Sequence, residues 1–266
     1  MESVCEQLEL SEVGWRAFVN SSFQFFPQIL HWIQILAFPG KMASTSSFFQ
    51  CSDPKKWKRL SEVYWEVVAE KGAKKKQLME LDKWYQEELP AKMAAQSHKS
   101  LTLEELGRLM EWKLMRGKFR PRLKQMVASN PAGTVESCTR KAFQLLPDVS
   151  AAIDELCQLK GIGPATASAV LAAGAPELAA FMADESVESV PGLSPIQYNV
   201  KHYLRYLEEI QLKSDALNKA SEEKWTPHRV ELCLWTWNVA QKLCPKLLEF
   251  LEDEEERPFK KLKTKQ

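Results

Sequence analysis

A chain of 266 residues with 45% hydrophobic side chains can bury a sizeable core, as one large domain or two small ones. Ten glycines and few β-branched runs argue against an all-β fold, so we predict an all-α fold. The six cysteines lack metal-ligand spacing, so we expect no disulfide, no metal and no cofactor. The most apolar stretch, residues 23–38, is too short and polar to span a bilayer, and no signal peptide is evident. We therefore expect a soluble intracellular protein with no membrane partner.

The sequence divides into three parts. We predict that residues 1–51 are an N-terminal extension, and we expect Met42 within it to be an alternative or original start. Residues 52–250 form a helical domain. Residues 251–266 are an acidic block followed by a basic block, which predicts a disordered tail. The basic end is typical of a nuclear-import signal or a nucleic-acid contact, although a merely solvating tail fits equally well.

The first part of the domain is expected to contain three helices. A helix is expected from Pro54 to Gly72, capped by Asp53, and another over 75–88, stopped by Pro90. Thr102 and Glu105 form a capping box at the start of a third helix. This helix is expected to run through residues 112–124, with its apolar side chains in the core: Trp112, Met115, Phe119 and Leu123.

Later helices are expected over 134–146, over 198–210, and from Pro227 onward, where Thr226 is the cap. Before the second of these, a connector covers 190–195.

Positive charge is concentrated in one half of the domain. Residues 54–124 hold 18 Lys or Arg against 10 Asp or Glu, a net charge of +8, which leaves about −7 for the rest. The densest basic cluster consists of Lys113, Arg116, Lys118, Arg120, Arg122 and Lys124. We interpret it as an outward-facing patch that contacts phosphates, and the alternative is a solvated helix face.

Residues 148–175 read as two helices joined by a very tight hairpin. Asp148 is the expected cap of the first helix, which stops at Gly161 because glycine tolerates a positive φ. Pro164 suits the first turn of the second helix, and Ile162 is expected to plug into the helix pair.

The N-terminus of that second helix can hold an anion, because it offers unpaired N–H groups and the positive end of the peptide dipoles. We predict that DNA phosphate is bound by six residues: Lys160, Gly161, Ile162, Gly163, Ala165 and Thr166. The alternative is a motif that only packs two helices together.

The pattern Leu159 to Ala167 resembles the helix-hairpin-helix motif of DNA repair proteins, and more narrowly that of the helix-hairpin-helix-GPD superfamily of DNA glycosylases. In that family a glycine-containing loop and an aspartate follow the second helix, and the aspartate lies about twenty residues past the second hairpin glycine. Here Asp184 lies 21 residues past Gly163. The whole chain is also similar to the poorly characterised Amun-like branch of the superfamily. This resemblance implies a nuclear protein with a glycosylase-like fold.

Two departures limit what the resemblance implies. Bifunctional members carry a nucleophilic lysine where this chain has Ala165, so no lyase activity is expected. Members with an iron–sulfur cluster have four C-terminal cysteines, whereas here only Cys233 and Cys244 are present.

We therefore carry two functional hypotheses. The first is a nuclear DNA-binding protein that retains monofunctional base excision, as a DNA N-glycosylase, through Asp184 as the catalytic carboxylate. Glu185 is a weaker candidate for the same role. In the second, Asp184 merely caps a short helix through Ser186 or Val187, and the protein is a catalytically silent relative used for protein interaction or regulation.

Overall fold

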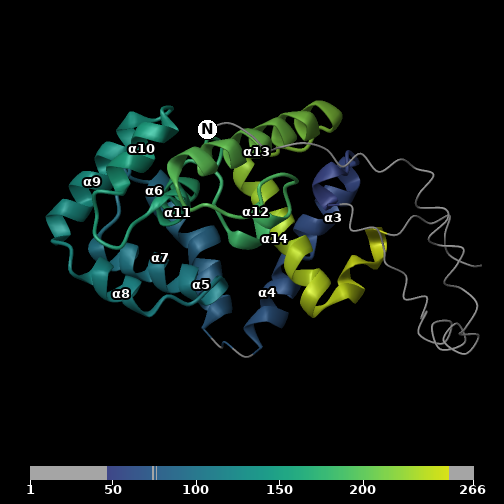
Figure 1. The fold of residues 1–266 in the computed structure, drawn as a ribbon, viewed down its shortest axis with the longest axis horizontal. Coiled ribbons are helices and arrows are strands. Elements are labelled where there is room, and N and C mark those ends of the chain that lie inside the picture. The colour runs from purple at the N-terminus through teal and green to yellow at the C-terminus, as the bar shows by residue number, and fades with distance from the viewer. Residues whose placement is uncertain (1–46, 74, 76, 252–266) are drawn as a thin grey trace, which may run out of the picture. The chain divides into compact units, whose positions relative to one another are not determined.

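The structure, a computed structural model, describes residues 47–73, 75 and 77–251. Every regular element in these residues is a helix, which confirms the all-α prediction (Figure 1). The predicted start at Met42, most of the N-terminal extension and most of the charged tail lie outside the described residues, so they stay predictions.

The elements follow in chain order. They are η1 (Phe48–Gln50), α3 (Pro54–Glu62), α4 (Tyr64–Gly72), α5 (Leu78–Lys83), η2 (Trp84–Glu88), α6 (Leu89–Ala94), α7 (Leu103–Arg116), α8 (Pro121–Ala128), α9 (Ala132–Leu145), α10 (Val149–Leu156), α11 (Pro164–Gly174), α12 (Asp184–Glu188), α13 (Val200–Ala220), α14 (Pro227–Leu243) and η3 (Pro245–Leu251).

Two helices organise the packing. α14 contacts α3, α4, α12 and α13, and α7 contacts α5, α8, α9 and α11. In Figure 1, α7 to α10 form one end of the helical domain, α3 and α14 lie toward the other end, and α11 and α12 lie between them. α11 is buried along almost its whole length, because its alanines allow neighbouring helices to approach closely.

The helical domain begins earlier than residue 52. The side chain of Phe48 is buried, and its ring centroid lies 4.7 Å from that of Trp57, which is itself fully buried. An aromatic pair at this distance belongs to one core. Residues from Phe48 onward therefore pack with the domain.

The first two expected helices have different ends in the structure. Val63 leaves helical geometry (φ −86°, ψ 2°), so the chain divides there into α3 and α4, which both pack against α14. Pro90 does not stop the second helix, which continues through η2 and α6 to Ala94. η2 is a π-helical turn in which the N–H of Leu89 reaches the carbonyl of Trp84, and Pro90 then occupies the first turn of α6, where proline is tolerated.

The third helix is shorter than predicted. Its capping box is confirmed, because the N–H of Glu105 donates to Thr102 and the Glu105 carboxylate accepts from the Thr102 N–H. However, the helix ends at Gly117, and α8 starts only at Pro121. Pro121 restricts Arg120 to extended geometry, which interrupts the helix.

The expected place of Phe119 in the core is wrong, because its side chain is 75% exposed in the linker 117–120 between α7 and α8. The remaining caps agree with expectation. Asp148 caps α10 by accepting from the Ala151 N–H, and Thr226 caps α14 by accepting from the Arg229 N–H.

Candidate nucleic-acid interface

The hairpin between α10 and α11 has the predicted turn at Gly161, but α10 ends at Leu156, before the predicted stop at Gly161. Gly161 adopts φ +80°, a left-handed conformation that favours glycine, and α11 begins at Pro164. Ile162 is buried, as expected for a side chain that plugs into the helix pair.

The hairpin is held on α8 by a side chain that the sequence did not single out. The Asn130 amide donates to the carbonyl of Lys160 over 3.0 Å, and its oxygen accepts from the Lys160 N–H over 2.9 Å. Gly161 lies so close to α8 that a Cβ there would stand 2.9 Å from the Cβ of Met126. The hairpin is therefore a fixed element rather than an isolated loop.

We expect Gly161→Ala to lower the free energy of unfolding by at least about 2 kcal/mol, because alanine is strained at positive φ and its Cβ would collide with Met126. Gly163→Ala is the matched control, since Gly163 has φ −119° and nothing within 4 Å of its added Cβ. Chemical denaturation measures both. Equal losses in the two variants would contradict this account of the hairpin.

Three backbone N–H groups of the hairpin have no acceptor. Among the described residues, the N–H groups of Gly161, Gly163 and Ala165 donate no hydrogen bond, while Thr166 and Ala167 donate to the Gly163 carbonyl. Free N–H groups at the start of a helix, together with the helix dipole, form a site for an anion.

The segment before Asp184 is non-helical, and side chains from two helices hold it in place. The hydroxyls of Tyr203 and Tyr206 on α13 donate to the carbonyls of Ala180 and Phe181. The Met182 N–H donates to Ser168 on α11. These bonds satisfy buried backbone groups, and they join the position of Asp184 to the second helix of the hairpin.

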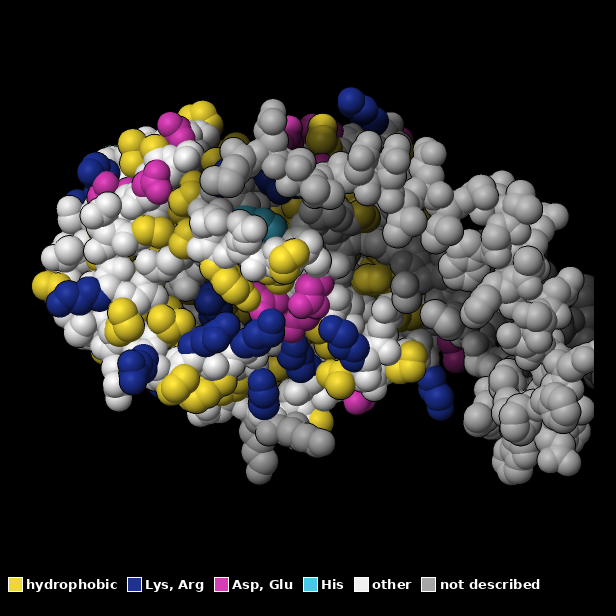
Figure 2. Space-filling view, in the orientation of Figure 1, with side chains coloured by type: hydrophobic (Ala, Val, Ile, Leu, Met, Phe, Trp, Pro, Cys, Tyr) yellow, Lys and Arg dark blue, Asp and Glu magenta, His cyan; other side chains and the backbone are white. Residues whose placement is uncertain are grey.

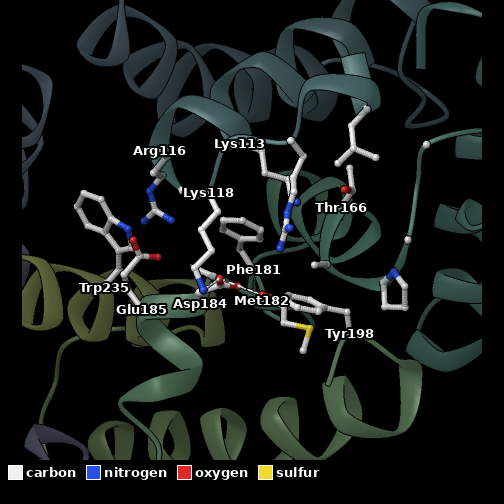
Figure 3. A pocket seen from close by; sticks show the side chains of 18 of the residues that line it. Lys113, Arg116, Lys118, Thr166, Phe181, Met182, Asp184, Glu185, Tyr198 and Trp235 are labelled. Atoms are coloured by element: carbon white, nitrogen blue, oxygen red, sulfur yellow. Dashed lines mark hydrogen bonds and ion pairs between the residues drawn. The ribbon is translucent and has the colours of Figure 1, made fainter. Parts of the chain in front are cut away.

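Asp184 is the first residue of α12, and its side chain does not cap that helix; the cap position belongs to Ala183. Instead, the carboxylate accepts from the Tyr198 hydroxyl, 2.9 Å from each oxygen, and pairs with the Lys118 ammonium at 2.7 Å. The predicted alternative of a capping role is therefore not observed. Lys118 and Tyr198 approach Asp184 from two sides (Figure 3).

Asp184 and the hairpin face one pocket of about 560 Å³. Of the six predicted phosphate-binding residues, Gly161, Gly163, Ala165 and Thr166 line it. Lys160 is exposed outside this lining, and the Ile162 side chain lies in the core. The other lining residues are Lys113, Arg116, Gly117, Lys118, Arg120, Pro121, Arg122, Leu123, Pro164, Phe181, Met182, Ala183, Asp184, Glu185, Tyr198 and Trp235.

The predicted basic patch separates into three groups. The first group lines the pocket: Lys118, Arg120 and Arg122 are exposed there, and Lys113 is half-buried. Lys124 is exposed but pairs with Glu111 at 3.1 Å, away from this pocket. Figure 2 shows Lys and Arg side chains grouped around acidic ones on this face.

Arg116 departs from the expectation that the whole patch faces outward, because its side chain is only 1% exposed. Its guanidinium lies 3.4 Å from the Glu231 carboxylate and 3.7 Å from that of Asp82, and 4.1 Å from the Trp235 ring centroid. Burial raises the pKa of Glu231 to about 7 and also raises that of Asp82, while Arg116 opposes both shifts. Arg116 is thus part of the pocket's inner wall.

Two lysines in the pocket have shifted pKa values of opposite sign. Burial lowers the pKa of Lys113, against the opposing attraction of Asp184. The hydrogen bond to Asp184 raises the pKa of Lys118. Lys113 makes no hydrogen bond or ion pair with another described residue, so its ammonium is available to an anionic ligand.

Some residues of the pocket were not predicted as site residues, namely Phe181, Tyr198 and Trp235. A local signal exists for Tyr198 alone, which lies in a short polar run with Asn199, Lys201 and His202. Glu185, the weaker catalytic candidate, also lines the pocket, but it pairs with Lys71 at 2.9 Å.

One comparison with known proteins gave a match. A model of the helix-hairpin-helix motif matches residues 145–173, which contain the hairpin described above. Searches of the curated proteins and of the solved structures found no match. Within the described ranges, no helix is long and apolar enough to cross a membrane, and no three His, Cys, Asp or Glu side chains form a group that could hold a metal ion.

Proposed function

We propose that this protein binds duplex DNA with the face formed by the hairpin, the linker 117–120 and α8. The observation that carries the proposal is that three free backbone N–H groups of a helix-hairpin-helix motif open onto a pocket lined by lysine and arginine. Unpaired N–H groups and basic side chains on one face are the elements of phosphate-backbone binding. The basic end of the tail supports a nuclear location for such a protein.

The pocket offers room for a nucleotide turned out of the duplex. Its volume of about 560 Å³ lies within the range of small-molecule sites, and Phe181 and Met182 give it apolar walls. An enzyme that acts on a base must first take it out of the stack. In this proposal the sugar of such a nucleotide would lie next to Asp184, which lines the pocket together with the hairpin.

In this proposal Asp184 supports monofunctional base excision. Its carboxylate would stabilise positive charge developing on the sugar and assist water attack as the base leaves. When DNA binds, the Lys118 ammonium would leave the Asp184 carboxylate and pair with a phosphate instead. Ala165 supplies no amine at the position of the lyase lysine, so the proposed reaction is hydrolysis without strand cleavage.

The salt dependence of binding tests the DNA interface. We expect the affinity for an undamaged duplex to fall steeply and linearly on a logarithmic scale as salt rises, because each neutralised phosphate releases counterions. Fluorescence anisotropy with a labelled duplex measures it. Absent binding, or an affinity that does not change with salt, would contradict the proposed interface.

Phe119 is expected to contact bases. It is a large aromatic side chain, 75% exposed, between Lys118 and Arg120 at the pocket. Aromatic stacking on a base contributes about 1–3 kcal/mol, so Phe119→Ala should weaken DNA binding by about that amount. Leu212→Ala, which removes a side chain that is 59% exposed on α13, is the control and should leave affinity unchanged. An unaltered affinity for Phe119→Ala would exclude this contact.

A further inference from the structure

The inner wall of the pocket contains two buried side chains with hydrogen-bond donors that lack acceptors. Arg116 and Trp235 both line the pocket and are each 1% exposed. Within the part of the chain that the structure describes, Nη2 and Nε of Arg116 and Nε1 of Trp235 have no hydrogen-bond partner, although Nε lies 3.7 Å from the Asp82 carboxylate. Buried donors are almost always paired, so unpaired donors on one pocket wall indicate a ligand that accepts from them.

The surrounding side chains fix the orientation of the Arg116 guanidinium. The guanidinium of Arg116 lies between the rings of Trp112, Phe181 and Trp235, at 5.4, 5.6 and 4.1 Å from their centroids. Its Nη1 and Nε are directed to the carboxylates of Glu231 and Asp82. Nη2 is therefore the guanidinium nitrogen that is not directed to a carboxylate. Figure 3 shows Arg116, Trp235 and Glu185 on the same side of the pocket.

These groups select among ligand chemistries. Neither guanidinium nor indole can accept a hydrogen bond, so the ligand atom that faces them must be an acceptor, such as a carbonyl oxygen. The neighbouring Glu185 carboxylate can accept from an N–H. A base edge with a carbonyl next to an N–H, called a lactam edge, matches this arrangement. An exocyclic amine in place of the carbonyl would put its own N–H donors against those of Arg116 and Trp235.

We propose that the inner end of the pocket recognises a nucleobase with a lactam edge, of the uracil, thymine or hypoxanthine type, in preference to amino bases such as adenine or cytosine. The proposal rests on the proposed function, because the base reaches this wall only when a nucleotide enters the pocket. Phe181 and Met182 would contact its faces.

Two duplexes that differ only at this edge test the proposal. Each carries hypoxanthine or adenine opposite an abasic spacer, so that base pairing does not differ. We expect the wild-type protein to bind the hypoxanthine duplex about tenfold more tightly, because an adenine amine would leave both donors unpaired. Equal affinities would overturn the base assignment alone, whereas no binding to either duplex would also overturn the proposed function.

Variants of the donors make the test specific. Trp235→Phe keeps a ring but loses the N–H, and Arg116→Lys keeps the charge but loses Nη2; each should reduce the hypoxanthine-to-adenine ratio towards one. Trp237→Phe, a tryptophan on the same helix outside the pocket lining, should keep the wild-type ratio. If Arg116→Lys does not fold, Trp235→Phe decides the question. The proposal would be overturned if Trp235→Phe, and Arg116→Lys where it folds, kept the wild-type ratio of hypoxanthine to adenine affinity.

Discussion

The Asp184→Asn variant is expected to lose base excision by about 10²- to 10⁴-fold, the usual contribution of a positioned acid–base group. Asparagine has the same shape but cannot carry the negative charge that would stabilise the sugar cation as the base departs. Duplexes with a panel of damaged and deaminated bases, incubated with wild type and variant, measure the loss. Binding of undamaged duplex should persist, because the hairpin N–H groups and the arginines are unchanged.

Asp154→Asn is the control, since Asp154 is exposed on α10 and does not line the pocket. It should excise as the wild type does. Equal excision by wild type and Asp184→Asn would exclude Asp184 as the catalytic group. No excision of any base by the wild type would instead support the alternative of a catalytically silent relative.

The largest loss of stability is expected from Asp82→Ala. Asp82 is fully buried on α5, accepts hydrogen bonds from Tyr64 and from Trp112, the latter at 2.6 Å, and lies 3.7 Å from Arg116. Removing one partner of a buried charge group leaves the rest uncompensated, at a cost of about 3–5 kcal/mol. Urea denaturation monitored by tryptophan fluorescence measures the loss.

Asp82→Asn should lose less than Asp82→Ala, because the amide oxygen still accepts one of the two hydrogen bonds. Asp154→Ala, an exposed change, should stay within about 0.5 kcal/mol of wild type. A loss below about 1 kcal/mol in Asp82→Ala would show that the carboxylate does not stabilise the buried Arg116. The burial of Arg116 in the inner wall of the pocket would then need another explanation.

The local features of the fold were predictable because short-range chemistry determines them. The caps at Thr102, Asp148 and Thr226 and the hairpin turn at Gly161 each depend on side-chain or backbone preferences within a few residues. The break at Gly117 was missed because apolar spacing continues across it as far as Leu123. Only the extended geometry imposed by Pro121 indicated the break.

The inner wall of the site depends on contacts that no local pattern shows. The carboxylates beside Arg116 come from α5 and α14, and Glu231 is 115 residues away in the chain. Arg116 therefore appeared in the sequence as one more member of a basic cluster. Tyr198 likewise reaches Asp184 only because the segment between them folds back. Asp184 itself was predicted from the resemblance to a glycosylase family that carries an aspartate at this distance from the hairpin, and in the structure it lines the same pocket as the hairpin.

The salt dependence of duplex binding by the double variant Arg120→Ala/Arg122→Ala tests the DNA-binding face most directly. Both arginines line the pocket, are exposed and have no ion pair with another described residue. If each contacts a phosphate, the slope of log affinity against log salt should become shallower by about 0.9 per lost contact. The control Lys55→Ala/Lys219→Ala removes the same charge from exposed positions on α3 and α13 and should keep the wild-type slope. Identical slopes in the two double variants would contradict the proposed interface.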